Sequence, residues 1–181
     1  MIDKSDISKI LLTEEEIHEI VKRLGRQISE DYKDKNLLLV SVLKGSVMFM
    51  ADLMREIDIH CKIDFMAVSS YGSGTSTSGS VKILKDLNID LSGYDLLIVE
   101  DILDSGVTLS NLRDMLMTRK PASFKICTFI DKPERRKADV IADYVGAQIP
   151  DAFVVGYGLD YDEKYRNLPY LGILDPKVYS K

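Results

Sequence analysis

The sequence predicts an α/β fold with a mainly parallel twisted sheet flanked by helices. Short apolar runs without polar interruption, at 37–43, 96–99 and 124–130, are typical of parallel strands buried on both faces. Stretches with apolar residues at helical spacing alternate with these runs, as βαβ units require. The length of 181 residues lies within the usual range of about 100–200 for one domain.

Composition and charge narrow the class of protein. The hydrophobic fraction of 45% and charged fraction of 29% are ordinary for a soluble globular protein. No apolar run approaches the about 18 residues of a membrane span. A net charge of −5 argues against a general nucleic-acid binder, which would carry a basic patch. Residues 1–6 are polar and lack the apolar segment of a secretory signal, so we expect a cytoplasmic enzyme or binding protein.

Each element has a local signal. Thr13 is the expected N-cap of the first helix, with Glu16 as its capping-box partner. The strand at 37–43 leads through a short polar turn into a helix that runs to about residue 57. A later helix begins near residue 107 and ends before Pro121. The other expected strands are at 62–69, 81–84, 96–99, 124–130, 144–145, 153–155 and 171–174.

Residues 70–80 are almost all Gly, Ser or Thr, a composition that does not pack into a core. Loops of this length inside compact domains are usually lids or binding loops. The plainer interpretation is a flexible hairpin connection.

The most informative stretch is 96–109, where an apolar run turns acidic at Glu100 and Asp101 and again at Asp104. Adjacent carboxylates after a buried strand are costly unless they bind a partner. Strand neighbours point to opposite sides, so we expect a turn to begin at these acids. Carboxylates suit sugar hydroxyls or Mg²⁺, and the small residues 105–108 suit a phosphate. The plainer interpretation of Asp104 is a helix N-cap.

This pattern resembles the phosphoribosyl-pyrophosphate (PRPP) motif of type I phosphoribosyltransferases, in the form found in hypoxanthine–guanine phosphoribosyltransferases. Asp104 is the distinguishing residue, because adenine and orotate phosphoribosyltransferases typically have a small or hydroxyl residue there. The chain has no Walker A loop, and Gly72-Ser73-Gly74 lacks the third glycine and the strand-to-helix context of a dinucleotide fingerprint.

Other segments resemble the same family in the expected order, from about residue 43 to 166. Leu43-Lys44-Gly45-Ser46 is similar to the pyrophosphate loop, in which a non-proline cis peptide precedes the lysine. Ser70-Tyr71-Gly72 resembles the start of the catalytic lid. Lys132 matches the lysine that contacts the purine O6, residues 153–161 resemble the base-stacking and Mg²⁺ segment, and Arg166 matches a pyrophosphate-binding arginine.

The resemblance implies a role for each matching residue. The implied catalytic residue is Asp104, which would hydrogen-bond the purine N7 and move its proton. PRPP ribose and phosphate would be bound by Glu100, Asp101, Asp104, Ser105, Gly106, Val107 and Thr108. Pyrophosphate would be bound by Lys44, Gly45 and Arg166. The purine would be bound by Lys132, Phe153, Val154 and Leu159. Ser70 and Tyr71 would belong to the lid, and the implied metal residues are Asp160, Glu100 and Asp101.

Four of these residues also have plainer interpretations: a surface charge for Lys132, a core position for Phe153, a turn acid for Asp160 and an ion pair with Asp162 for Arg166. The neighbouring basic run 135–137 we interpret as a solvated face.

The implied function is purine salvage, in which hypoxanthine or guanine reacts with PRPP to give IMP or GMP and pyrophosphate, with Mg²⁺ as the cofactor. The implied architecture is a single domain over 1–181, with a core at about 37–145 and a small hood formed by about 1–12 and 146–181. By analogy we expect a homodimer or homotetramer, with no nucleic acid or membrane as partner.

Two other functions are compatible with parts of the pattern. A PRPP-binding regulatory protein on the same fold is disfavoured by the purine-site residues and by the charge of −5. A diphosphate-dependent kinase is disfavoured by the lack of a Walker loop. Preference among hypoxanthine, guanine and xanthine depends on the pocket shape around Val154, Leu159 and Asp160.

Overall fold

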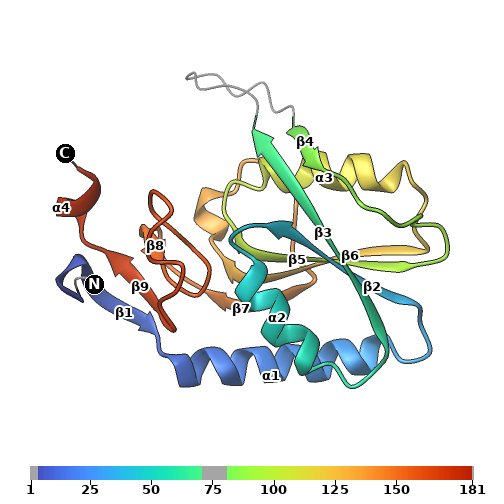
Figure 1. The fold of residues 1–181 in the computed structure, drawn as a ribbon, viewed down its shortest axis with the longest axis horizontal. Coiled ribbons are helices and arrows are strands. Elements are labelled where there is room, and N and C mark those ends of the chain that lie inside the picture. Colours follow the sequence, from blue (N-terminus) through green and yellow to red (C-terminus); the bar gives the residue numbers. More distant parts are fainter. Residues whose placement is uncertain (1–3, 71–80, 181) are drawn as a thin grey trace.

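The structure, a computed structural model, describes residues 4–70 and 81–180 (Figure 1). Its main layer is a six-stranded sheet with the strand order β4-β3-β2-β5-β6-β7. All neighbouring strands are parallel except β3 and β4. The predicted mainly parallel α/β sheet is therefore confirmed. The strands are β2 (Leu37–Leu43), β3 (Cys61–Ser70), β4 (Val81–Lys85), β5 (Asp95–Leu103), β6 (Ser123–Asp131) and β7 (Tyr144–Gln148).

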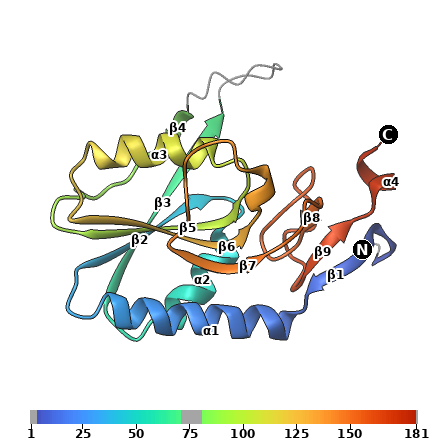
Figure 2. The ribbon, with the colours of Figure 1, turned by 180° about the vertical axis from the view of Figure 1, so that it is seen from behind.

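Helices cover both faces of this sheet (Figures 1 and 2). Helices α1 (Glu14–Asp31) and α2 (Val47–Arg55) pack on one face, in a core that includes Leu97 and Val99 of β5. Helix α3 (Val107–Met117) packs on the other face, against Leu96 and Ile98. The uninterrupted apolar run of β5 is thus explained by burial from both sides. No helix in the described part of the chain is long and apolar enough to cross a membrane.

The helix starts follow the local signals only in part. Thr13 and Glu16 form the predicted capping box of α1. Helix α3 is capped by Gly106, whose φ of +76° is a left-handed conformation that favours glycine, and no side chain forms a cap hydrogen bond. Asp104 is therefore not the N-cap of this helix.

Strand β5 runs further than we predicted. It continues through Glu100 and Asp101 to Leu103, because it remains paired with β6 from Glu100↔Thr128 to Leu103↔Asp131. The expectation of a turn at the two acids is wrong. The turn begins only at Asp104, immediately after the strand.

A second, three-stranded antiparallel sheet has the order β1-β9-β8, and its strands are β1 (Ile7–Leu12), β8 (Val154–Val155) and β9 (Leu171–Leu174). It lies at one end of the molecule, beside both described chain ends (Figures 1 and 2). The short helices η1 (Lys4–Asp6), η2 (Pro133–Arg135) and α4 (Pro176–Tyr179) complete the elements of the described residues.

The order of the main sheet indicates where a ligand would bind. The chain moves from β2 outward to β3 on one side, and from β5 outward to β6 on the other. Ligands of open α/β sheets bind beyond the carboxyl ends of the strands, where the strand order reverses. In this chain those ends are followed by residues 44–46 and 104–106.

Candidate active site

Two cavities adjoin the carboxyl ends of the sheet and share Ile102 and Asp104. The first, called here the loop cavity, has a volume of about 240 Å³ and is lined by Val42, Leu43, Gly45, Glu100, Asp101, Ile102, Leu103, Asp104, Ser105, Gly106, Thr108 and Leu109. The second, called the aromatic cavity, has a volume of about 510 Å³ and is lined by Ile102, Asp104, Lys132, Arg135, Asp151, Ala152, Phe153, Val154, Leu159, Asp160 and Tyr179. Asp104 therefore lies at the junction of the two cavities, where two ligands, one in each cavity, would meet.

The loop cavity has the features of an anion site. Residues 104–106 connect the end of β5 to α3, and Val107 is the first residue of that helix. The first N–H groups of a helix have no intrahelical acceptor, and the helix dipole favours negative charge there. The hydroxyl of Ser105 is only a distant acceptor for the Val107 N–H, at 3.5 Å. The small residues thus leave room for an anion against the backbone.

Glu100 and Asp101 lie together on the wall of this cavity, although they are neighbours in a strand. Burial and the adjacent carboxylate raise the pKa of Glu100 well above its ordinary value. Burial also raises the pKa of Asp101 to about 6. The Asp101 carboxylate lies so close to the backbone of Gly45 that a Cβ there would stand 1.7 Å from it. This pair is suited to a ligand that supplies hydroxyl groups or positive charge.

Lys44 and Arg166 are brought together by Glu163, an acid that no motif in the sequence indicated. Glu163 accepts from Lys44 Nζ at 3.1 Å and from Arg166 Nη2 at 3.3 Å, through different carboxylate oxygens. The Arg166 Nε atom is buried and has no hydrogen-bond partner among the described residues. The peptide bond between Leu43 and Lys44 is cis, as the resemblance implied. Two cations around one carboxylate make a site that fits a larger anion.

Asp160 lies on the other side of Arg166. Its carboxylate is 2.9 Å from Arg166 Nη2 and also accepts from the backbone N–H of Glu163, at 2.9 Å. The ion pairs of Arg166 are thus with Asp160 and Glu163, and not with Asp162 as the plainer interpretation had it.

The described side chains offer few ligands for a metal ion. Among residues 4–70 and 81–180 no group of three or more acidic, histidine or cysteine side chains is arranged to hold an ion. Mg²⁺, however, usually takes only one or two carboxylates and completes its shell with water and substrate phosphates. The cavity-lining pair of Glu100 and Asp101 fits that requirement when a phosphorylated substrate is present.

The aromatic cavity contains a buried amine and an exposed ring. Lys132 is only 5% exposed, and its Nζ donates to the carbonyl of Ala152 at 2.5 Å. Burial lowers its pKa. Phe153 is 41% exposed and stacks on Tyr179 with ring centroids 5.0 Å apart. The interpretations as a surface charge for Lys132 and a core position for Phe153 are therefore wrong, and both residues face a ligand-sized space with Val154 and Leu159.

The basic run after β6 is not simply a solvated face. Arg135 Nε lies 2.8 Å from Asp104 Oδ1, and its Nη1 donates to Asp151 at 3.0 Å. Arg136 donates to the backbone carbonyls of Leu103 and Asp104. Our interpretation as a solvated face is wrong for Arg136, whose side chain is only 18% exposed, whereas Arg135 is exposed and still forms these two ion pairs.

The side chain of Asp104 is partly exposed, and one of its carboxylate oxygens accepts no hydrogen bond from the described residues. Its side chain is 39% exposed, yet its Oδ1 atom is buried and accepts no hydrogen bond within the described part of the chain. The contact with Arg135 is an ion pair without hydrogen-bond alignment. A carboxylate oxygen in this state can accept a proton from a ligand in the aromatic cavity.

The predicted lid lies almost wholly outside the described residues. Ser70 is the last residue of β3, and Tyr71 and the rest of 71–80 are not described. The role of this segment stays a prediction.

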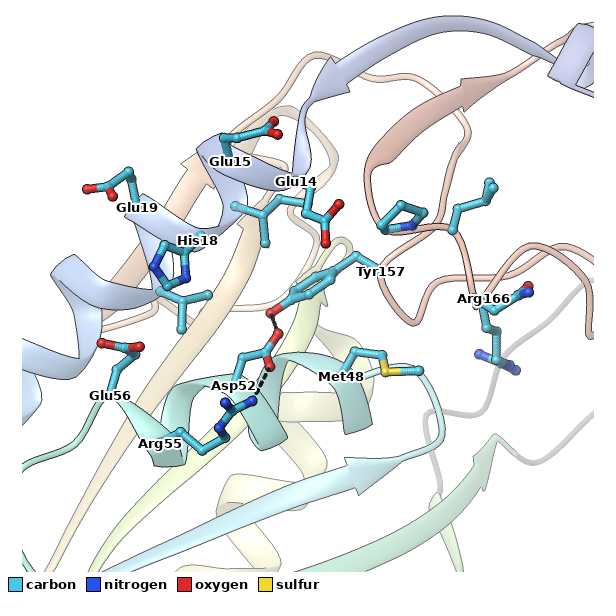
Figure 3. A pocket seen from close by; sticks show the side chains of 15 residues that line it. Glu14, Glu15, His18, Glu19, Met48, Asp52, Arg55, Glu56, Tyr157 and Arg166 are labelled. Atoms are coloured by element: carbon cyan, nitrogen blue, oxygen red, sulfur yellow. Dashed lines mark hydrogen bonds and ion pairs between the residues drawn. The ribbon is translucent and has the colours of Figure 1, made fainter.

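A larger cavity, of about 630 Å³, lies between α1, α2 and the segment 157–169 (Figure 3). Tyr157 points across it, and its hydroxyl donates to Asp52 of α2 at 2.7 Å. A Cβ at the next residue, Gly158, would stand 2.0 Å from the carbonyl of Gly45. The Tyr157–Asp52 contact thus supports the close packing of this segment against the loop cavity, and the larger cavity shares Arg166 with the candidate site.

Known proteins share this fold and sequence over nearly the whole chain. The model of the phosphoribosyl transferase domain matches residues 8–162. The hypoxanthine-guanine phosphoribosyltransferases of Staphylococcus epidermidis and Bacillus subtilis are 57% and 56% identical, over 97% and 98% of this chain and 98% of each relative.

Solved structures agree with these relatives. The crystal structure of a hypoxanthine phosphoribosyltransferase from Staphylococcus aureus has a TM-score of 0.96 and 55% identity, and covers 98% of this chain and 96% of that one. The hypoxanthine phosphoribosyl transferase of Trypanosoma cruzi has a TM-score of 0.94 and 45% identity, with 99% and 97% of the two chains covered.

Proposed function

This chain belongs to the hypoxanthine-guanine phosphoribosyltransferase family, and from that premise we propose that it transfers the 5-phosphoribosyl group of PRPP to N9 of hypoxanthine or guanine. The products are IMP or GMP and pyrophosphate, so the reaction is one of purine salvage. The observation that carries the proposal is the position of Asp104 between two cavities, one suited to a phosphorylated sugar and the other to a planar base.

The reaction is a displacement at the ribose C1, with oxocarbenium-like character as in glycoside cleavage. The bond from C1 to the pyrophosphate oxygen breaks, the bond from C1 to purine N9 forms, and the base loses a proton. Asp104 hydrogen-bonds the purine N7 and moves that proton, for which its Oδ1 is suited because it accepts no hydrogen bond from the described residues, although it forms an ion pair with Arg135. The remaining residues position the two substrates and stabilise charge.

PRPP occupies the loop cavity and the cationic site beside it. Glu100 and Asp101 hold the ribose hydroxyls, and the backbone and hydroxyls of residues 104–108 bind the 5′-phosphate. Lys44, Gly45 and Arg166 bind the pyrophosphate group. Because Glu163 contacts both of these cations, the pyrophosphate group replaces a carboxylate when it binds.

The purine occupies the aromatic cavity. Lys132 donates to the 6-oxo group, whereas the 6-amino group of adenine would place a donor against a donor. The ring of Phe153 stacks on the purine face. The Val154 backbone pairs with the base edge, and Leu159 closes the pocket beside it.

Mg²⁺ is the proposed cofactor, held by Glu100 and Asp101 and, through water, by Asp160. When bound, it neutralises charge on the diphosphate leaving group. The ion pair between Asp160 and Arg166 supports an indirect contact for that residue.

Further proposals concern the surroundings of the site. Residues 70–80, including Ser70 and Tyr71, close over the substrates and exclude water. The chain is one domain with a core at about 37–145 and a hood from about 1–12 and 146–181, which the separate sheet β1-β9-β8 supports. We expect a cytoplasmic homodimer or homotetramer, with neither nucleic acid nor a membrane as partner.

Initial rates with hypoxanthine, guanine, xanthine and adenine, each with PRPP and Mg²⁺, test the function. We expect pyrophosphate release with hypoxanthine and guanine and far slower turnover with adenine. Adenine turnover close to that of hypoxanthine would contradict the role of Lys132. PRPP binding without pyrophosphate release for any base would favour the regulatory alternative, which the relatives do not support.

A further inference from the structure

The loop after β5 is attached along its carbonyl side to the segment 132–138. The backbone N–H of Lys132 donates to the carbonyl of Leu103 at 3.0 Å. The N–H groups of Lys137 and Ala138 both donate to the carbonyl of Ser105, at 2.9 and 3.1 Å. These bonds secure the first and last of three consecutive carbonyls and leave the middle one, that of Asp104, to a side chain.

That side chain is Arg136. Its Nη1 donates to the carbonyl of Leu103 at 3.0 Å and also to the carbonyl of Asp104. Its Nη2 donates to the carboxylate of Asp131, the last residue of β6. The two side chains are only 18% and 11% exposed. A partly buried guanidinium with three acceptors, one of them a carboxylate, is held in one orientation.

Arg136 also packs under the turn itself. A Cβ at Gly106 would stand 3.1 Å from the Cδ of Arg136. The arginine stem therefore supports the residue whose left-handed φ of +76° starts helix α3.

The orientation of the carbonyls determines the orientation of the amides. A trans peptide unit is planar, and its C=O and N–H point in opposite directions. When the carbonyls of residues 103–105 all face the segment 132–138, the N–H groups of residues 104–106 face away from it. Residues 104–106 line the loop cavity.

We propose that Arg136 is a positioning residue for the 5′-phosphate of PRPP, which acts by keeping the backbone N–H groups of residues 104–106 turned toward the loop cavity. The inference rests on the proposed function, because it assigns the loop cavity to that phosphate. Arg136 does not itself contact the substrate. It lies in the segment that begins with the purine-binding Lys132, so one short segment supports both substrate sites.

The test compares Arg136→Lys and Arg136→Ala with the control Arg113→Ala. Arg113 also donates to a backbone carbonyl, that of Asp139 at 3.0 Å, but this carbonyl is outside the loop after β5. A lysine keeps the charge but lacks the planar fork that reaches the carbonyls and Asp131 together. It also provides a milder variant if Arg136→Ala does not fold.

The readout is the inhibition constant of ribose 5-phosphate, measured as a competitor of PRPP, beside that of pyrophosphate. We expect the Arg136 variants to raise the KM for PRPP and the inhibition constant of ribose 5-phosphate by about 10- to 100-fold, as for other supporting partners of a binding site. In the same variants, the inhibition constant of pyrophosphate and the KM for hypoxanthine change by no more than about twofold. Added guanidinium partly restores ribose 5-phosphate binding to Arg136→Ala. The control Arg113→Ala has the same constants as the wild type.

A folded Arg136 variant with unchanged ribose 5-phosphate inhibition would overturn the proposal. So would an equal weakening of ribose 5-phosphate, pyrophosphate and hypoxanthine, because that indicates general loss of structure. A wild-type protein that releases no pyrophosphate from PRPP with any purine base refutes the proposed function instead, so the two failures are distinguishable.

Discussion

The adjacent acids of β5 should lower the free energy of unfolding of the ligand-free protein at neutral pH relative to acidic pH. The substitution Asp101→Asn should restore part of that free energy. Burial raises the pKa of Asp101 from its ordinary 3.8 to about 6 in the folded protein. Between these two pH values the folded protein keeps a proton that the unfolded chain has lost. Unfolding then releases a proton, so the free energy of unfolding falls as the pH rises through this range.

The size of the effect follows from the two pKa values. A change from 3.8 to about 6 corresponds to a full cost of about 3 kcal/mol above pH 6. Asp101 is only partly buried, and solvent screening reduces the cost, so we expect Asp101→Asn to gain about 1–2 kcal/mol at pH 7.5 relative to its effect at pH 4.5. Such a gain raises Tm by about 2–8 °C for a chain of this length. The raised pKa of Glu100 acts in the same direction, because one of its causes is the charge of Asp101.

The assay is urea unfolding of the ligand-free wild type and variant at both pH values, and the quantity of interest is the difference between the two proteins. Asp139→Asn, at an exposed position, serves as the control for removing one negative charge. The same Asp101→Asn protein should lose the stabilisation that PRPP with Mg²⁺ gives the wild type. An advantage of Asp101→Asn that does not grow with pH, or that Asp139→Asn reproduces, would refute the argument from burial.

Three further substitutions test other contacts of the site. Asp104→Asn should retain PRPP binding but reduce kcat by about 10²-fold or more, as is usual for loss of a general acid–base group; unchanged turnover in a steady-state assay would remove Asp104 from the mechanism. Glu163→Gln should lower the inhibition constant of pyrophosphate by about two- to fivefold, because an exposed carboxylate no longer competes for Lys44 and Arg166, and weaker pyrophosphate inhibition would contradict this. Tyr157→Phe should lower the free energy of unfolding by about 1–2 kcal/mol, because its hydroxyl donates to the Asp52 carboxylate. The control Tyr94→Phe should lower the free energy of unfolding less, because the Tyr94 hydroxyl accepts from Lys62 at the surface. Equal losses for the two variants in thermal unfolding would contradict the importance of burial for the Tyr157–Asp52 contact.

Most of the fold was predictable because its signals are local. The apolar runs at 37–43 and 124–130 are strands within one or two residues of the expected ends, and the capping box of α1 is present. The end of β5 was not predictable in this way. Glu100 and Asp101 remain in the strand because β6 pairs with them, and that pairing involves residues about 28 positions further along the chain.

The candidate site was predictable as a set of residues but not as a network. Residues 100–108 were recognised together, since motif and loop are contiguous in the chain. The acid that contacts Lys44 was missed, because Glu163 is 119 residues away and has no local pattern of its own. Arg136 was misinterpreted for a similar reason: a charged residue beside other charged residues looks solvated until its acceptors are known.

What the sequence by itself determined is the type and order of the elements and the loop chemistry around Asp104, because hydrophobic periodicity and turn residues act between near neighbours in the chain. What only the tertiary structure decided is which charges meet. The carboxyl ends of β2, β5 and β6 stand at one edge of the sheet, and the segment after β8 packs against them. That arrangement places Arg136 against the loop after β5 and Glu163 between two cations, since ion pairs and hydrogen bonds depend on distance in space and not along the chain.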